Sequence, residues 1–360
     1  MNERIEVPIA NLSNIAIFPE YPGQDVLEEI RQHIRDTSCP HTWRGHSHTK
    51  PPPGGTPPQY CDEYDVPAPD RVAKIAPCPC CNPFHRQYKK KGKVAWFPDE
   101  SVIRLIGPVC YAKINPTGHE SALIDLRRNL LVREQLATIK LHAPHIENLI
   151  AVIDSLSPIA SALDALKTNL HQALENDLAL FWSRTVRGGV LTTEESRQVS
   201  IQKSDGTYGS KRETTIVTFA TISGHAMIDH SGQISAGKKL LALRSGLTTI
   251  AKRLQDVGDL TELSEAERRT FHENLPAARK QVSAVLEDAR RRQLFLTSDA
   301  LDTLARWGKH QNQPRPFNIQ RKTGVIVLTS GGQKQPPPVI VDIPSNASNA
   351  LPDLPVIGEM

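Results

Sequence analysis

The crowding of cysteines in the first third of the chain is the feature that most constrains how it can fold. All six cysteines of the 360 residues lie between Cys39 and Cys110. Three of them fall within residues 76–81, whose sequence is Ala-Pro-Cys-Pro-Cys-Cys, and His85 follows four residues later. Thiolates and imidazoles are the side chains that zinc prefers in proteins. The alternative, small buried thiols of an ordinary core, does not explain three cysteines in four positions. The sequence therefore predicts a metal site.

The spacing of Cys78 and Cys81 fits a zinc knuckle, in which a tight turn directs two thiolates at one metal ion. Downstream, residues 93–97 and 101–106 have the composition of two strands, and the Pro-Asp-Glu sequence between them suits a turn. We therefore expect a knuckle that is followed by a β-hairpin.

A helix is expected to begin at Pro108, because proline is favoured in the first position of a helix. Cys110 then lies in the first turn, where the helix dipole favours the ionised thiolate. The order of knuckle, hairpin and ligand-bearing helix over residues 76–119 resembles the treble-clef class of zinc finger. That class normally carries a second ligand on the helix, whereas this sequence has Lys113 three residues after Cys110. The fourth ligand must therefore come from another part of the chain.

His85 is the first candidate for this fourth ligand, and Cys80 and His119 are the alternatives. The expected ligands of a structural Zn²⁺ are thus Cys78, Cys81, His85 and Cys110. A structural zinc contributes about 10–16 kcal/mol in small peptides, so it would decide whether so small a module folds. A second site across the proline-rich loop is a further possibility, with Cys39, His41, His46, His48 and Cys61 as its potential ligands.

Positive charge is concentrated around the cysteine module. No acidic residue occurs between Arg71 and Pro98, and this window holds seven lysines and arginines although the whole chain is formally only +4. Aromatic residues are interleaved with them, a mixture that is typical of contacts with phosphates and bases. The candidate contacts to DNA or RNA are Arg86, Lys89, Lys90, Lys91 and Lys93. The alternative is that these lysines keep a hairpin edge soluble and that the aromatic residues form the core.

The rest of the chain predicts a mostly helical α+β protein. The expected parts are an N-terminal segment with a proline-rich linker (1–59), the zinc-binding module (60–119), a helical stalk or coiled coil (120–182), a C-terminal α+β domain (183–330) and a disordered tail (331–360). Apolar residues alternate at steps of three and four between Ile146 and Phe181, which favours a stalk that could form a homodimer. Pro158 is expected to kink this helix or to start a second one.

Several local patterns lie within the C-terminal domain. The β-branched residues 214–222 follow turn residues at 204–206 and predict a hairpin. Leucines and isoleucines at helical spacing predict a helix over 240–257, and Ser264 with Glu267 predicts a capping box. Pro276 is expected to start a further helix, and residues 324–328 to form a strand. The tail is rich in Pro, Ser and Asn, a composition that favours disorder.

The sequence favours a cytoplasmic protein without membrane association, because its start lacks a secretory pattern and its longest apolar run, 149–153, is short. Whether it is an enzyme is not decided by any motif, and a non-enzymatic role is favoured. Cys61-Asp62-Glu63 matches the letters of a zinc deaminase signature, but nearby prolines interrupt the helices that such a site needs. The first hypothesis is a zinc-binding regulatory or nucleic-acid-associated protein. The alternative is a protein–protein adaptor or assembly protein with a zinc-braced end and a helical oligomerisation stalk.

Overall fold

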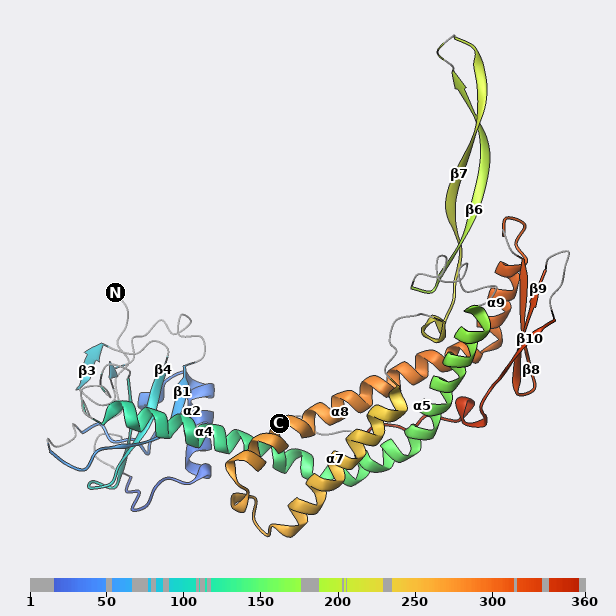
Figure 1. Ribbon diagram of the computed structural model, residues 1–360. Coiled ribbons are helices and arrows are strands. Elements are labelled where there is room, and N and C mark those ends of the chain that lie inside the picture. Colours follow the sequence, from blue (N-terminus) through green and yellow to red (C-terminus); the bar gives the residue numbers. More distant parts are fainter. Residues whose placement is uncertain are drawn as a thin grey trace. The chain divides into compact units, whose positions relative to one another are not determined.

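The architecture is seen in a computed structural model (Figure 1). The structure describes residues 16–49, 54–66, 77–78, 82–86, 91–107, 110, 114, 118–175, 188–202, 204, 206–228, 235–313, 316–331 and 337–355. Within the described residues, helices and strands are mixed and helices predominate, which confirms the expected mixed helical and sheet class. The chain forms two compact units, Met1–Glu134 and Gln135–Met360.

The N-terminal unit combines a small antiparallel sheet with helices. Its elements are α2 (Gln24–Thr37), β1 (Gln59–Asp65), β2 (Pro77–Cys78), β3 (Asn82–Arg86), β4 (Lys91–Phe97), β5 (Val102–Ile106) and the start of α4 (His119–His142). One sheet has the strand order β1-β4-β5, and β2 pairs with β3 separately. The expected hairpin over 93–106 is thereby confirmed as β4 and β5, whereas β1 was not predicted.

The sheet β1-β4-β5 has an apolar cluster on each face, because side chains alternate between the faces of a strand. On one face, Leu27, Ile30 and Ile34 of α2 pack against residues that include Ile103 and Leu105 of β5. On the other face, Leu126 of α4 packs with Phe97, Val102 and Ile106, among others. Both clusters are small, as expected for a unit of this size.

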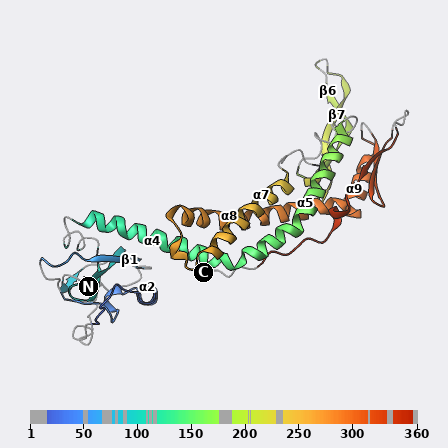
Figure 2. The same cartoon turned by 60° about the horizontal axis from the view of Figure 1, so that its bottom comes forward.

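The C-terminal unit is built around three long helices that lie side by side (Figure 2). Its elements are α5 (Ile146–Glu175), β6 (Val190–Gln202), β7 (Tyr208–Thr221), α7 (Ala236–Asp256), α8 (Glu265–Gln293), α9 (Ser298–Gly308), β8 (Phe317–Lys322), β9 (Val325–Ser330) and β10 (Val339–Asp342). The last three strands form an antiparallel sheet in the order β10-β9-β8, and β6 and β7 form a separate two-stranded ribbon.

The apolar seam that was expected to form a dimeric stalk lies on α5. Leu156, Leu163 and Leu170 are almost completely buried, and they belong to the cluster that also contains the inner faces of α7 and α8. The chain thus covers this seam by itself. A homodimer through the stalk stays an untested prediction.

Two prolines at which the sequence allowed a helix to begin lie inside helices instead. α5 continues through Pro158 and bows along its length (Figure 1), as expected where one backbone donor is missing. The break between helices lies instead at a short 3-10 helix around Pro144, between α4 and α5. Pro276 was expected to start a helix, but it lies inside α8. Buried residues on both sides, such as Leu275 and Ala278, hold that helix together across the proline.

The tail after residue 331 was expected to be disordered, and this prediction is wrong for residues 337–355. Val339–Asp342 pairs with β9 as β10, and Val341 and Ala347 are buried. Gln293 of α8 donates hydrogen bonds to the carbonyl oxygens of Ala347 (3.0 Å) and Asn349 (2.8 Å). The edge of β9 thus gave the short apolar stretch of the tail a strand to pair with, which composition alone does not reveal.

Other local predictions are confirmed. β6 and β7 form the expected hairpin, β9 covers the strand expected at 324–328, and α7 covers the helix expected from residue 240. Ser264 and Glu267 form the capping box of α8, in which the Ser264 amide donates to the Glu267 carboxylate at 2.8 Å and the Ser264 hydroxyl accepts from the Glu267 amide at 3.3 Å.

Candidate metal centre and exposed ribbon

The four expected zinc ligands are described to different extents. Cys110 is buried and packs with Ile106 and Leu126 beneath the sheet. Cys78 and His85 lie in β2 and β3, where only the backbone is described, and Cys81 lies outside the described residues. The register of β2 and β3 places Cys78 opposite Asn82, so the chain reverses direction within the expected knuckle. Within the described residues, no three metal-ligating side chains form a cluster.

The two alternatives for the fourth ligand are not described either. Cys80 lies outside the described residues, and His119 is described only by its backbone at the start of α4. The choice among His85, Cys80 and His119 therefore rests on the sequence.

Cys61, a proposed member of the second site, lies in the apolar cluster between α2 and the sheet. Burial raises the pKa of the Cys61 thiol to about 12, although a hydrogen bond with Tyr21 opposes this rise. Burial also raises the pKa of Cys39. Both groups are therefore thiols at neutral pH unless a metal displaces the proton. The potential ligands Cys39, His46, His48 and Cys61 do not form a cluster of three in the part of the chain that the structure describes, and the side chain of His41 is outside it.

His46 and His48 lie side by side at the edge of the sheet. Their ring centroids are 3.7 Å apart, His46 is buried and His48 is half-buried, and His46 pairs with Ile103 in a parallel bridge. The Ser47 amide donates to the Ile103 carbonyl oxygen at 2.8 Å. Side chains alternate along such an edge, so the two imidazoles share one side. The sequence indicated these histidines as potential ligands but not their mutual contact.

The edge segment of residues 46–49 has a buried arginine on the side opposite the two imidazoles. Arg104 donates to the carbonyl oxygen of Thr49 at 2.9 Å and to the Glu100 carboxylate at 2.7 Å, and its guanidinium lies 4.4 Å from the centre of the Phe97 ring. A buried charge needs such partners, because an isolated charge is costly to remove from water. Arg104 therefore fixes the edge segment to β5.

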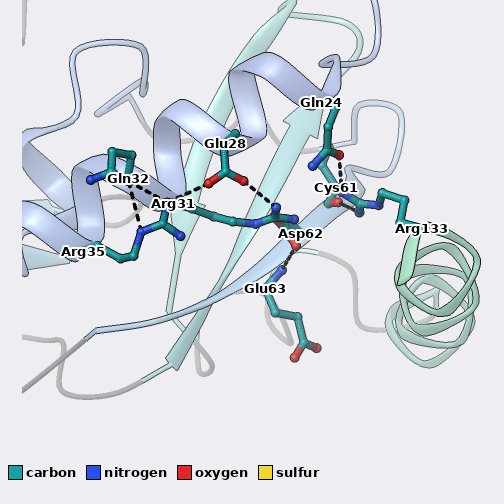
Figure 3. Close-up of polar contacts among 9 residues, drawn as sticks. All are labelled: Gln24, Glu28, Arg31, Gln32, Arg35, Cys61, Asp62, Glu63 and Arg133. Carbon is teal, nitrogen blue, oxygen red and sulfur yellow. Dashed lines mark hydrogen bonds and ion pairs between the residues drawn. The ribbon is translucent and has the colours of Figure 1, made fainter. Parts of the chain in front are cut away.

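In the deaminase-like sequence Cys61-Asp62-Glu63, the first two residues bond to arginines of neighbouring helices (Figure 3). Cys61-Asp62-Glu63 lies in the middle of strand β1, not at a helix start. The Asp62 carboxylate is buried and accepts from Arg31 of α2 at 2.8 Å, while Arg133 of α4 donates to the Cys61 carbonyl oxygen at 2.5 Å. Burial raises the pKa of Asp62, and the charges of Arg31 and Arg133 oppose this rise. These contacts bind α2 and α4 to β1.

Two of the expected phosphate contacts face carboxylates of the neighbouring strand. Lys93 forms an ion pair with Glu63, and the Lys91 ammonium lies 3.7 Å from the Asp65 carboxylate. Burial lowers the pKa of Lys93. The side chain of Arg86 is not described, and Lys89 and Lys90 lie outside the described residues. β1 thus offsets part of the positive charge of this region.

The β6–β7 ribbon is an exposed feature of the C-terminal unit. Its base is fixed, because Leu191 is buried and the Trp307 indole of α9 donates to the Thr192 carbonyl oxygen at 2.9 Å. Beyond Thr193, no described residue of either strand is buried. Tyr208 and Ile216 are 76% and 69% exposed. The sequence predicted a hairpin but not that both of its faces are exposed. Residues 194–202 lack an apolar face, and this pattern could have indicated the exposure.

A surface pocket of about 970 Å³ lies where α8, α9 and β8 meet. Of its lining side chains, Arg321 donates to the Leu296 carbonyl oxygen at 2.5 Å, and Arg290 pairs with Glu287 at 3.0 Å. Asp302 is the carboxylate among the lining residues, which include neither histidine nor cysteine.

Comparison of the chain with protein-family models, with curated proteins and with solved structures gave no match. Within the helical stretch Glu120–Ala173, an 18-residue window has a mean hydropathy of 1.6, which is high enough for a membrane span, but 44% of this window is buried inside the protein. Core helices of soluble proteins have the same composition, and the buried seam of α5 belongs to such a core.

Proposed function

We propose that the protein is a non-enzymatic adaptor or assembly protein whose contact element is the β6–β7 ribbon. The observation that carries this proposal is the exposure of both faces of the ribbon beyond Thr193. In the described sheet, each strand has only the other as a neighbour, so each has one open edge. Isolated two-stranded hairpins are marginally stable in water, and open edges are templates for strands of other chains. A polypeptide that pairs with the ribbon would stabilise it.

The anchoring of the ribbon supports the same proposal. The Ile222 amide donates to the Gly189 carbonyl oxygen at 2.8 Å, and Trp307 holds Thr192 from the side of α9. The strands then extend away from the long helices (Figure 1). A fixed base and an exposed arm present a binding edge in a defined orientation, which lowers the entropy lost on binding.

Site-specific photo-crosslinking in the cells that naturally produce the protein tests this function. A benzophenone amino acid is placed at Tyr208 or Ile216 of the ribbon, and at Leu241 of α7 as the control, because Leu241 is also exposed. We expect discrete protein adducts from the ribbon positions and none from position 241. Equal labelling from all three positions, or no protein adduct from the ribbon, would contradict the proposal.

We propose further that a structural Zn²⁺ braces the N-terminal unit, held by Cys78, Cys81, His85 and Cys110. The cysteine spacing and the reversal of the chain at β2 and β3 support this assignment. Small units with weak cores commonly need such a metal.

X-ray absorption at the zinc edge of the reduced, full-length protein tests the ligand set. We expect three sulfur ligands at about 2.3 Å and one imidazole nitrogen at about 2.0 Å. Two imidazoles would implicate the adjacent His46 and His48 in place of His85 and one cysteine. Protein without zinc after purification in reducing buffer would rule out the metal site. The variant His33→Gln is the control and should leave the zinc spectrum unchanged. His33 lies on α2 outside the expected ligand set, and its ring hydrogen-bonds the Thr42 hydroxyl at 2.9 Å.

Association with DNA or RNA is a second candidate function, favoured by the seven positive charges between Arg71 and Pro98. Because Lys91 and Lys93 face carboxylates, Arg86, Lys89 and Lys90 would have to make most of the phosphate contacts. Binding should then weaken steeply between about 50 and 200 mM salt and be abolished by charge reversal at Lys89 and Lys90. Binding that is absent at low salt would exclude this function.

A further inference from the structure

We infer that the ribbon pairs with the ribbon of a second copy of this chain, through the open edge of β6 and antiparallel about Ser196. This inference rests on the proposed function, since it names the partner of the same contact element. It moves the expected self-association from the buried seam of α5 to an exposed strand.

The charge pattern of β6 is self-complementary about its midpoint. β6 runs from Val190 to Gln202, so Ser196 lies at its centre. An antiparallel two-fold pairing about Ser196 places Glu195 of each copy opposite Arg197 of the other. Both ion pairs lie on one face of the sheet, because residues two apart point to the same side. The same register places Glu194 opposite the neutral Gln198.

Within one hairpin, Glu195 has no oppositely charged residue directly across from it on β7, so it can pair with Arg197 of a second copy. The register of β6 and β7 places Thr215 opposite Glu195 and Glu213 opposite Arg197. In the dimer, Arg197 would therefore lie between two carboxylates, one from its own chain and one from the second copy. Opposite charges directly across neighbouring strands are favourable, and like charges are unfavourable.

The edge of β7 offers a poorer match. A two-fold pairing about Arg212 of β7 places Lys211 opposite Glu213, but it also places Arg212 opposite its own copy, a like-charge contact that the neutral Ser196 avoids in β6. Pairing through β6 produces a four-stranded sheet in the order β7-β6-β6-β7. Such a sheet is more stable than a two-stranded ribbon, so association would also order the arm.

A charge-swap experiment on the full-length chain tests this inference. One variant carries Glu195→Arg. The second carries Arg197→Glu together with Glu213→Arg, which keeps opposite charges across the hairpin itself. Glu194→Arg is the matched control, because this glutamate points to the other face and would meet Gln198. Sedimentation equilibrium measures self-association, and far-UV circular dichroism checks that each variant is folded.

We expect the wild type to dimerise and each charge variant alone to bind itself at least about tenfold more weakly, since two like-charge pairs form. An equimolar mixture of the two variants restores the dimer, because both pairs are again of opposite charge. The control changes the affinity less than about twofold. Rescue by mixing cannot result from misfolding.

A wild-type chain that stays monomeric at all concentrations would overturn the inference, as would a dimer that is insensitive to Glu195→Arg. In either case the proposed function is judged separately by photo-crosslinking: adducts from Tyr208 or Ile216 to another protein would retain it. An adduct of twice the mass of the chain supports both proposals.

Discussion

At the scale of single residues, the N-terminal unit depends on buried charges that have defined partners. Asp62 and Arg104 are both almost completely buried, and each is bonded to a group that is distant in the sequence. Removing one partner of such a pair leaves an uncompensated charge, which costs more than the pair contributes. Substitution of Arg31, the partner of Asp62, measures the cost of leaving the buried carboxylate unpaired.

Replacing Arg31 by Met should destabilise the N-terminal unit by about 3 kcal/mol, because Asp62 keeps its charge without its closest cation. Arg35→Met is the control: it lies on the same helix but pairs with Glu28 in an exposed position, so we expect a loss of less than about 1 kcal/mol. Urea unfolding followed by hydrogen exchange of β1 and β4 amides measures both. Equal effects of the two substitutions would contradict this prediction.

The Arg31→Met defect should also depend on pH. The pKa of Asp62 is raised in the folded protein, so the protonated carboxyl favours folding and stability falls as pH rises through the interval between its unfolded and folded pKa values. Arg31 lowers this pKa, so its loss extends the interval upward. We expect a smaller defect near pH 4 than near pH 7. A defect that is constant over this range would show that Asp62 is not its cause.

The candidate site was only partly predictable at this scale. The spacing of Cys78 and Cys81 is a local signal, and sequence shows it directly. The contact of His46 with His48 depends on pairing with Ile103, and the environment of Cys61 depends on packing against α2. Both are contacts between distant residues, for which the sequence had no pattern. The ion pair of Lys93 with Glu63 could not be predicted, because Glu63 lies in β1 and that strand was not expected.

At the scale of elements, close packing of the backbone makes one glycine indispensable. Gly224 has a φ of 76°, and a Cβ atom there would lie 2.1 Å from the backbone nitrogen of Phe295. Gly224→Ala should lower the stability of the C-terminal unit by more than about 2 kcal/mol, since strain and overlap add. A melting temperature equal to that of the wild type would contradict this.

Gly246 of α7 differs from Gly224, because a larger residue fits at its position without overlap. It lies inside the helix, and a Cβ atom there would have no neighbour within 4 Å. Gly246→Ala should therefore raise stability by about 0.5–1 kcal/mol, because alanine loses less backbone entropy in a helix. The two substitutions are compared in one thermal unfolding experiment, where shifts of the same sign would refute the packing argument.

The start of α8 gives a prediction about acid sensitivity. Hydrogen bonds from Arg253 and then Ser264 lower the pKa of Glu267 from 4.5 to about 2. A depressed carboxyl pKa stabilises the fold above the ordinary value, and this contribution is lost as pH falls from 4.5 towards 2. Glu267→Gln should be less stable than the wild type at neutral pH, and the difference should shrink through this interval. A difference that grows on acidification would contradict the assignment.

Element prediction succeeded where the signal was local and failed where tertiary packing decided the outcome. The capping box of α8 and the turn-flanked hairpin β6–β7 are confirmed. Pro276 and the tail were misjudged because buried neighbours hold the proline in α8 and because β9 offers an edge to β10. The seam on α5 was recognised, but the sequence did not tell whether the chain itself would cover it.

At the scale of the whole molecule, the two compact units should respond differently to loss of metal. If zinc braces the N-terminal unit, a strong chelator should speed hydrogen exchange in β1, β4 and β5, because the weak core there no longer has its cross-link. Exchange in α7 and α8 should not change. Slow exchange in all these elements after chelation, with zinc removed, would show that the metal does not support the fold.

The hydrogen bond between Trp307 and Thr192 ties an indole ring to the root of the ribbon. A protein in which the other tryptophans are replaced by phenylalanine would carry one native tryptophan at the fixed base of its arm. If docking changes the packing at this base, the emission of that indole changes with it, and no dye is needed. The anchor that orients the arm thus also makes its occupancy optically visible.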